Sequence, residues 1–184
     1  MSDAAALALD ALIEQWLRMH GSALQPYDPE WPSLCAAGPE HTDSSGATWL
    51  PWRPVRRPTA RLPALDGLER ALETPLHADI RAYYERWWSG PLEVRSPSLR
   101  LQLILLWNEE DADRLVENLI GHALDQRRRR VPFSAFLATT EPAGEEMVSI
   151  DNTTGEVVLE LPGGRQRRTL ARSLASFLPA FMPA

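Results

Sequence analysis

Lysine is absent from this sequence, and cysteine occurs once, as Cys35. All 19 basic residues are therefore arginines, and we draw no functional conclusion from this bias because either basic residue keeps a surface soluble. A single cysteine excludes an internal disulfide and is typical of a reducing compartment. We therefore expect a cytoplasmic protein, whose 184 residues are enough to form one domain around an ordinary hydrophobic core.

Long hydrophobic runs are also absent. The best candidate, Leu103–Trp107, is far shorter than the roughly 18 residues that cross a bilayer. The N-terminal segment lacks the basic start of a secretory signal, and Asp10 and Glu14 interrupt its apolar residues. We expect any membrane association to be peripheral. Because the chain is acidic, the anionic cytoplasmic leaflet would repel it, so we expect attachment through a protein rather than through lipid.

The charge balance is acidic, since 25 aspartates and glutamates give a net charge of −6. Such a chain is poorly suited to nucleic acid and better suited to a basic partner. The charge is also uneven. Residues 1–50 carry seven acidic residues and one arginine, whereas residues 127–184 carry six acidic residues and eight arginines. The negative excess is therefore N-terminal.

The spacing of apolar residues predicts both helices and strands. Helical periodicity covers Asp3 to His20, Ala64 to Glu73, Leu76 to Trp88 and Thr169 to Phe181. A further helix should begin after Asn108, a favourable N-cap, and end near Arg129 because Pro132 prevents its continuation. Strands are predicted at Leu99–Leu105, Phe133–Thr139, Met147–Asp151 and Glu156–Leu161, with a hairpin turn at Asn152–Gly155. This order predicts a single α+β domain over residues 1–184, with a mostly antiparallel sheet packed with helices.

Residues 26–63 lack a clear period. They contain half of the 16 prolines together with Trp31, Trp49 and Trp52. Disordered segments rarely carry such large apolar side chains. We therefore interpret this stretch as an irregular segment that packs on the domain, with one short strand near Trp49.

The residues form no recognisable catalytic or metal-binding pattern. The four histidines lack metal-type spacing and Cys35 has no companion cysteines, so we expect no metal and no cofactor. His122 and Asp125 lie three residues apart on a predicted helix, but no nucleophile in a recognisable setting accompanies them, which favours an ordinary packed histidine. Gly163-Gly164-Arg165 is shorter than a phosphate-binding loop and favours a turn. We therefore expect a protein that is not an enzyme.

Two charge clusters bound the helix predicted after Asn108. Its start is acidic, with Glu109, Glu110, Asp111, Asp113 and Glu117, and its end is the arginine run 127–130. Acids at the start and bases at the end complement the helix dipole by about 0.3–1 kcal/mol each. Five acidic residues are more than compensation of the helix dipole requires, and they repel one another. The sequence is therefore equally compatible with dipole compensation and with a binding role for this cluster. The arginine run fits a solvated helix end better than a lipid or nucleic-acid contact.

A series of motifs continues from this helix to the C-terminus. It comprises Leu115-Val116-Glu117-Asn118-Leu119-Ile120-Gly121-His122, Phe136-Leu137-Ala138-Thr139, Val148-Ser149-Ile150 and Thr154-Gly155-Glu156-Val157. Together these motifs resemble the Syd family of SecY-interacting proteins, and the resemblance extends from about Leu68 to the C-terminus. Residues 21–63 match loosely, through Cys35 and the stretch 49–54. The resemblance implies an α+β fold of the SMI1/KNR4-like superfamily.

The family resemblance also implies a function. Proteins of this family are expected to bind the basic cytosolic loops of SecY, a translocon subunit, through an electronegative concave surface, and to regulate or quality-check the translocase. This implies a cytoplasmic protein that is peripheral on the cytoplasmic side of the inner membrane. The acidic helix start of the family is matched by Glu109, Asp111 and Glu117, and is extended here by Glu110 and Asp113. Additional acidic candidates, from the loosely matching segment, are Asp28, Glu30, Glu40 and Asp43.

A second function is compatible with the same features. Relatives in the wider superfamily include immunity-type proteins that neutralise basic toxins, and an acidic surface would serve that role equally well. A neighbouring toxin gene, or tight binding to a basic nuclease domain without binding to SecY, would favour this alternative.

Overall fold

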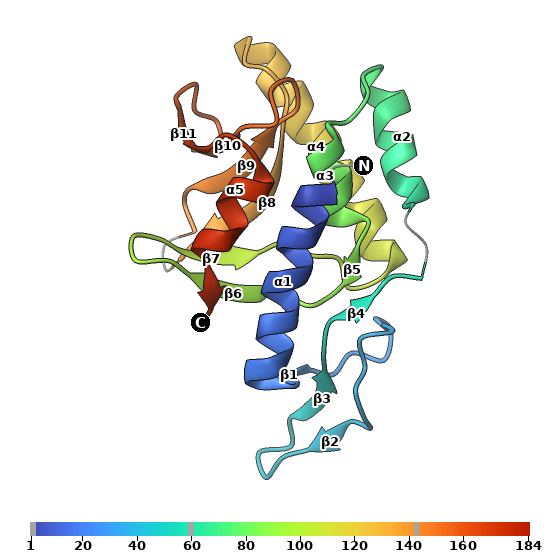
Figure 1. Ribbon diagram of the computed structural model, residues 1–184. Helices are drawn as coiled ribbons and strands as arrows, with labels where there is room; N and C mark the ends of the chain where they lie inside the picture. The colour runs from blue at the N-terminus through green and yellow to red at the C-terminus, as the bar shows by residue number, and fades with distance from the viewer. Residues whose placement is uncertain (1–2, 59–60, 142–143) are drawn as a thin grey trace.

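The computed structural model describes residues 3–58, 61–141 and 144–184, and Figure 1 shows its elements. The helices are α1 (Asp3–His20), α2 (Pro63–Leu72), α3 (Ala78–Tyr84), α4 (Glu109–Arg129) and α5 (Leu174–Phe177), which the 3-10 turn η1 (Leu178–Ala180) extends. The helices predicted for residues 3–20 and 109–129 are confirmed, and the one predicted for residues 64–73 is confirmed to within one residue. None of the described helices is both long and apolar enough to cross a membrane.

An antiparallel sheet of seven strands forms the centre of the described chain, in the order β11-β10-β9-β8-β7-β6-β12. Its strands are β6 (Leu92–Arg95), β7 (Arg100–Leu103), β8 (Ser134–Thr140), β9 (Met147–Asp151), β10 (Val157–Glu160), β11 (Arg167–Ala171) and β12 (Met182–Pro183). Gly155 closes the β9–β10 hairpin at φ +75°, and a side chain there would collide with the ring of His77. The single-domain α+β class and the mostly antiparallel sheet are confirmed.

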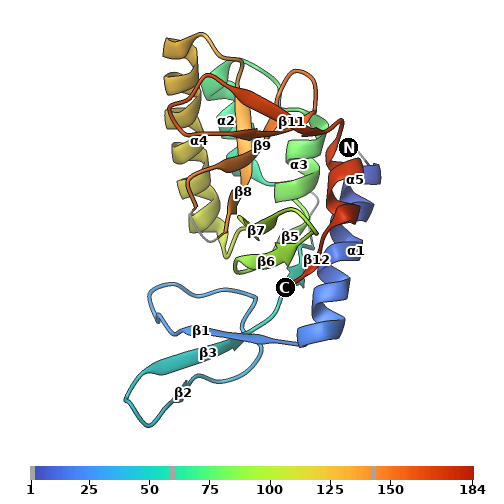
Figure 2. The same cartoon turned by 90° about the vertical axis from the view of Figure 1, so that its left-hand side faces the viewer.

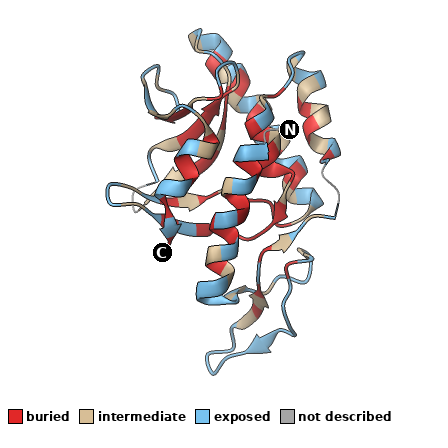
Figure 3. Ribbon diagram, in the orientation of Figure 1, coloured by how far each residue is buried: buried red, intermediate tan, exposed pale blue. Residues whose placement is uncertain are grey.

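Helices cover both faces of this sheet. Figure 2 shows α4 on one side of β8 and β9, and α1 and α5 on the other. The long helices α1 and α4 each bury one apolar side, and Figure 3 shows buried and exposed segments alternating along α1. On α1 the buried residues include Leu9 and Ile13, and on α4 they include Leu115 and Leu119. The polar side of α4 is thereby left in solvent along its whole length.

The tryptophan-rich segment forms a second, smaller sheet in the order β1-β3-β2. Its strands are β1 (Ala23–Pro26), β2 (His41–Thr42) and β3 (Thr48–Trp52). β3 confirms the short strand expected near Trp49, whereas β1 and β2 were not predicted from the sequence. This sheet projects from the body below α1 in both Figure 1 and Figure 2.

Trp52 anchors the small sheet to the body. Its ring stacks on Trp16 of α1, with centroids 5.5 Å apart, and meets Trp107 edge-on at 5.8 Å. Trp52 is 4% exposed, and Gly90 packs so closely on it that a Cβ there would come within 2.8 Å of the indole. Just beyond Trp52, β4 (Val55–Arg56) pairs with β5 (Trp87–Trp88). The segment is therefore joined to the domain by large apolar contacts.

Two of the predicted helices are wrong in part. The C-terminal helix expected from Thr169 to Phe181 is instead β11, the short α5, η1 and β12. The chain pairs with β10 as far as Ala171, and the Ser173 side chain then caps a new helix by accepting from the backbone N–H of Ser176. The helix expected from Leu76 to Trp88 ends at Tyr84, because Trp87 and Trp88, the last two residues of the expected range, pair with β4 as strand β5.

Candidate functional site

The acidic start of α4 is shaped by a pair of reciprocal caps. The Asn108 side chain accepts a hydrogen bond from the backbone N–H of Asp111 at 2.8 Å, which confirms Asn108 as the N-cap. The Asp111 carboxylate in turn accepts from the backbone N–H of Trp107 at 2.9 Å. Asp111 is therefore half-buried and occupied in holding the helix start. It differs in this respect from the other four acidic residues expected at the site.

Those four residues form what we call the acidic stripe: Glu109, Glu110, Asp113 and Glu117. All four are exposed, and none belongs to an ion pair found among the described residues. At about 100° of helical rotation per residue, their side chains fall within an arc of about 100°, whereas Asp111 points to the opposite side. Glu109, Asp113 and Glu117 are spaced four apart, a like-charge spacing that destabilises an isolated helix. The stripe is therefore a concentration of negative charge without internal compensation by ion pairing.

The loop after β1 packs against the start of α4. The Trp107 indole N–H donates to the Trp31 carbonyl at 3.0 Å, and the Asn108 amide donates to the Pro32 carbonyl at 2.9 Å. The Ser33 hydroxyl completes the contact by donating to the Trp107 carbonyl at 2.5 Å. Arg114 of α4 lies over the Trp31 ring, 3.9 Å from its centre. Four contacts thus join a segment of the N-terminal third to the helix that carries the acidic stripe.

These contacts determine which of the additional acidic candidates lie near the stripe. Glu30 is the neighbour of Trp31 in the chain and is exposed. Asp28 lies in the same loop, where its carboxylate accepts from the backbone N–H of Glu30 at 2.9 Å and shapes the turn. Glu30 is therefore exposed in the loop that packs on α4, while Asp28 has a local structural role as well.

The other two additional candidates belong to the small sheet. Asp43 accepts hydrogen bonds from the Ser45 backbone and hydroxyl, from the Ala47 backbone and from the Trp49 indole at 2.8 Å. These bonds lower the pKa of the Asp43 carboxyl from 3.8 to about 2. Glu40 is exposed just before β2. Asp43 therefore holds the β2–β3 turn, and the caps and packing contacts of α4 described above involve neither residue.

An open groove of about 470 Å³ lies beside the acidic stripe. It is lined by Pro32, Ser33, Leu34, Trp88, Trp107, Asn108, Glu109 and Glu110. Leu34 is 67% exposed, although Trp107 is buried. The Arg57 guanidinium lies over the Trp88 ring, 4.3 Å from its centre. Burial lowers the pKa of Arg57, although the negative charges of Glu85 and Glu109 act to raise it. The groove thus offers an apolar floor with two carboxylates on its rim, a combination that suits apolar and basic side chains together.

Comparisons with known proteins identify the family. The family model described as "Syd protein (SUKH-2)" matches residues 6–183. The chain belongs to the Syd family. A "Protein Syd" from Pseudoalteromonas atlantica is 40% identical over 85% of this chain and 82% of its own length. The one from Pectobacterium atrosepticum is 46% identical over 72% and 71% of the two chains, and the one from Tolumonas auensis is 35% identical over 100% and 92%.

The Syd match covers more of the chain than the sequence motifs indicate. Those motifs resemble the family from about residue 68 onward, whereas the matched range begins at residue 6 and includes the small sheet and the loop that packs on α4. The groove and the loop beside the acidic stripe are therefore part of the Syd domain. The sequence alone did not identify Trp31 and Leu34 as site residues, and their only signal is the presence of large apolar side chains in a proline-rich stretch.

His122 forms no catalytic pair with Asp125 in this Syd-family chain. The carboxylate of Asp125 accepts from Arg129, while the His122 Nε2 lies 2.7 Å from the Gln126 amide and 3.5 Å from Glu160. Among residues 3–58, 61–141 and 144–184, no three histidine, cysteine, aspartate or glutamate side chains are grouped to hold a metal ion. Burial raises the pKa of the Cys35 thiol to about 11, which makes it a poor nucleophile.

Proposed function

We propose that this Syd-family protein binds the basic cytosolic loops of SecY through the acidic stripe and the groove beside it, as a non-enzymatic protein that regulates or quality-checks the translocase. The observation that carries the proposal is the exposed stripe of four carboxylates on one arc of α4, which belong to no ion pair found in the described part of the chain. SecY's cytosolic loops are basic by the positive-inside rule, so their charge is complementary to this surface. The protein would then act in the cytoplasm and reach the inner membrane through its partner.

The physical argument for an external partner is the repulsion within the stripe. Like charges four residues apart cost an isolated helix about 0.2–0.5 kcal/mol per pair. Glu117 lies in the third turn of α4, beyond the reach of the helix dipole, so the dipole does not offset its repulsion with Asp113. A basic loop placed along the stripe removes this cost and gains charge-assisted hydrogen bonds.

The proposal is tested by neutralising the stripe and measuring binding to purified SecY in nanodiscs. The variant carries Glu109→Gln, Glu110→Gln, Asp113→Asn and Glu117→Gln, and leaves Asp111 unchanged because Asp111 caps the helix. We expect the affinity to fall about tenfold or more, and the residual binding to depend less on salt than that of the wild type.

The matched control removes the same four charges elsewhere on the surface. It carries substitutions to Gln at four exposed glutamates: Glu14, Glu73, Glu93 and Glu145. This control should retain SecY affinity and its salt dependence. Equal losses in both variants would show a general effect of net charge and would overturn the site. Binding of the wild type to a basic toxin domain but not to SecY would favour an immunity function instead.

A further inference from the structure

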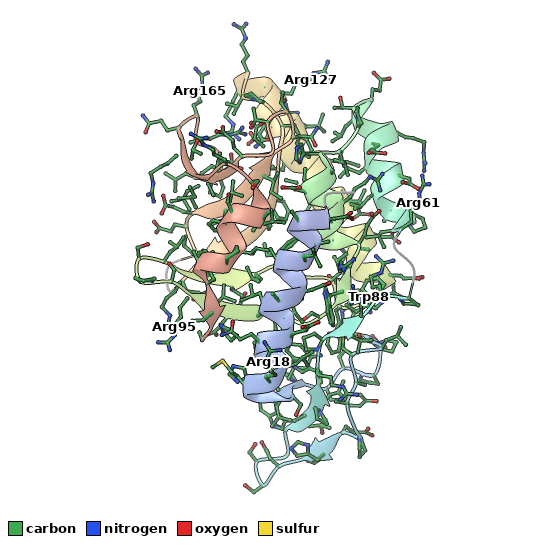
Figure 4. The ribbon with its side chains drawn as sticks, viewed as in Figure 1. Arg18, Arg61, Trp88, Arg95, Arg127 and Arg165 are labelled. Carbon is green, nitrogen blue, oxygen red and sulfur yellow. The ribbon has the colours of Figure 1, made fainter. Side chains whose placement is uncertain are left out.

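The end of the molecule opposite the acidic stripe carries a concentration of arginines. The last turn of α4 and the β10–β11 hairpin meet there, and they contribute Arg127, Arg128, Arg130, Arg165 and Arg168, which we call the arginine patch. All five are exposed, and none belongs to an ion pair found among the described residues. Figure 4 shows Arg127 and Arg165 at the same end, whereas Arg18 and Arg95 lie elsewhere.

Two further arginines hold this end together. Arg129 donates to the Gly164 carbonyl and to Asp125, which joins the last turn of α4 to the β10–β11 loop. Arg167 donates to Glu160 at 2.8 Å and to the Pro132 carbonyl at 2.6 Å. Since these two guanidinium groups are occupied within the protein, the positions of the patch residues are set by the fold before any ligand binds.

An open cleft of about 690 Å³ lies within the patch. Arg128, Arg130 and Arg165 line it. Of the carboxylates on its wall, Glu156 is the one that belongs to no ion pair found among the described residues. The patch is therefore positive in spite of the net charge of −6. Glu117, the last residue of the acidic stripe, lies ten residues before Arg127 on the 21-residue α4, about 15 Å along the helix axis at 1.5 Å per residue. That distance exceeds the Debye length of about 8 Å at physiological ionic strength, so the stripe does not cancel the local field.

Exposed aliphatic side chains accompany these arginines. Leu124, one turn before the arginine run, is 48% exposed, and Leu161, in the same loop as Arg165, is 52% exposed. A groove between α2 and α4 brings Leu124 together with Arg127 and Arg130. Single-stranded nucleic acid is instead bound by arginines combined with exposed aromatic platforms. None of the described residues that line the arginine cleft is aromatic, and Phe133, which lines the groove between α2 and α4, is half-buried. Arginine next to exposed leucine is the composition of a surface that lies on a bilayer.

We propose that the arginine patch binds the anionic headgroups of a phospholipid bilayer, with Leu124 and Leu161 entering the interface between headgroups and acyl chains. The proposal uses no residue of the acidic stripe. It replaces the expectation that the acidic chain is repelled by an anionic leaflet, because the patch presents positive charge to the membrane while the stripe remains available to another partner. The protein would then make two contacts, one with lipid and one with its protein partner.

The experiment is flotation of the full chain with phosphatidylglycerol vesicles and with phosphatidylcholine vesicles, in the absence of SecY. We expect binding to the anionic vesicles alone, decreasing as salt rises. The variant Arg127→Gln/Arg165→Gln should lower this binding by about fivefold for each arginine removed. Its control, Arg18→Gln/Arg95→Gln, removes the same charge from other exposed positions and should bind as the wild type does.

Three results would overturn the proposal. They are equal binding to both kinds of vesicle, equal losses in the two double variants, and binding to RNA or to an acidic protein without binding to phosphatidylglycerol. The four-residue stripe variant should float with anionic vesicles at least as well as the wild type. Failure of SecY binding would therefore leave the vesicle result unaffected, and the two proposals can fail independently.

Discussion

The guanidinium of Arg114 lies 3.9 Å from the centre of the Trp31 ring, so that a side chain of α4 holds the loop that follows β1. Arg114 is also the basic residue nearest to the acidic stripe along the helix, one residue after Asp113. Its stacking on Trp31 directs this positive charge toward the loop. The same contact therefore joins the loop that lines the groove to the helix that carries the stripe.

Replacing Arg114 by Gln tests the structural part of this relationship. The variant loses the cation over the indole, a contact worth about 0.5–1 kcal/mol at exposed sites. We expect the free energy of unfolding, measured by urea denaturation, to fall by about that amount. Arg18→Gln serves as a control, since Arg18 is exposed on α1, and surface changes of that kind stay within about 0.5 kcal/mol. Equal losses in both variants would show that the stack contributes nothing.

We expect Asp113 to lower the free energy of unfolding of the protein. Glu109 and Glu117 lie four residues away on either side, and Glu110 lies three residues away. Asp113→Asn should therefore raise the free energy of unfolding by about 0.5 kcal/mol or more, and it should weaken the proposed binding to SecY. Asp113→Glu keeps the charge and should change neither quantity appreciably. A variant Asp113→Asn that is no more stable than Asp113→Glu would argue against repulsion within the stripe.

The long elements of the fold could be predicted because their signal is local. α1 and α4 each repeat an apolar stripe over several turns, and Asn108 marks the start of α4 by its own side-chain chemistry. The two-residue strands β2, β4, β5 and β12 could not be predicted, since their pairing depends on distant residues. Trp87 and Trp88 extend the period of α3, yet the Trp87 indole donates at 2.8 Å to Asp10, which lies 77 residues earlier in the chain. That contact and the pairing with β4 override the helical spacing.

The site was predictable only as a set of candidates. The sequence places five acidic residues at one helix start, but it does not show which carboxylates the fold uses. Asp111 is occupied as a cap and Asp43 as a turn acceptor, whereas Glu109 and Glu110 are exposed and belong to no ion pair found among the described residues. The groove depends on a loop and a helix that are about 75 residues apart in the chain, so no local pattern encodes it.

Glu160 makes the stability of the fold depend on acid pH. Burial acts to raise the pKa of the Glu160 carboxyl. Hydrogen bonds from His122 and Ser134 and the charge of Arg167 outweigh this effect and lower the pKa from 4.5 to about 2. Because the folded pKa lies below the unfolded one, the stabilisation from this group is complete above about pH 5 and is lost as the pH falls toward about 2. The wild type should therefore lose part of its stability over that range.

The variant Glu160→Gln isolates this contribution. It cannot carry the negative charge that pairs with Arg167, so it should be less stable than the wild type at neutral pH, by about 3 kcal/mol. The difference in free energy of unfolding between the two proteins should shrink as the pH is lowered from about 5 to about 2. Urea denaturation at several pH values measures it. A difference that stays constant over this range would contradict the lowered pKa.

Leu34 tests whether the groove adds apolar recognition to the charge of the stripe. With 67% of its surface exposed on the groove wall, it contributes little to the core, so Leu34→Ser should leave the free energy of unfolding nearly unchanged. If a partner side chain packs on it, the substitution should lower SecY affinity about tenfold, or about 1.4 kcal/mol. Leu34→Met keeps an apolar side chain of similar volume and should bind almost as the wild type does.

The salt dependence separates this effect from that of the acidic stripe. Removing carboxylates should reduce the slope of affinity against ionic strength, whereas Leu34→Ser removes no charge and should leave the slope unchanged. A loss of affinity with an altered slope would mean that Leu34 acts by positioning Glu109 and Glu110 rather than by contacting the partner. Full affinity in Leu34→Ser, with reduced affinity in the stripe variant, would restrict recognition to charge alone.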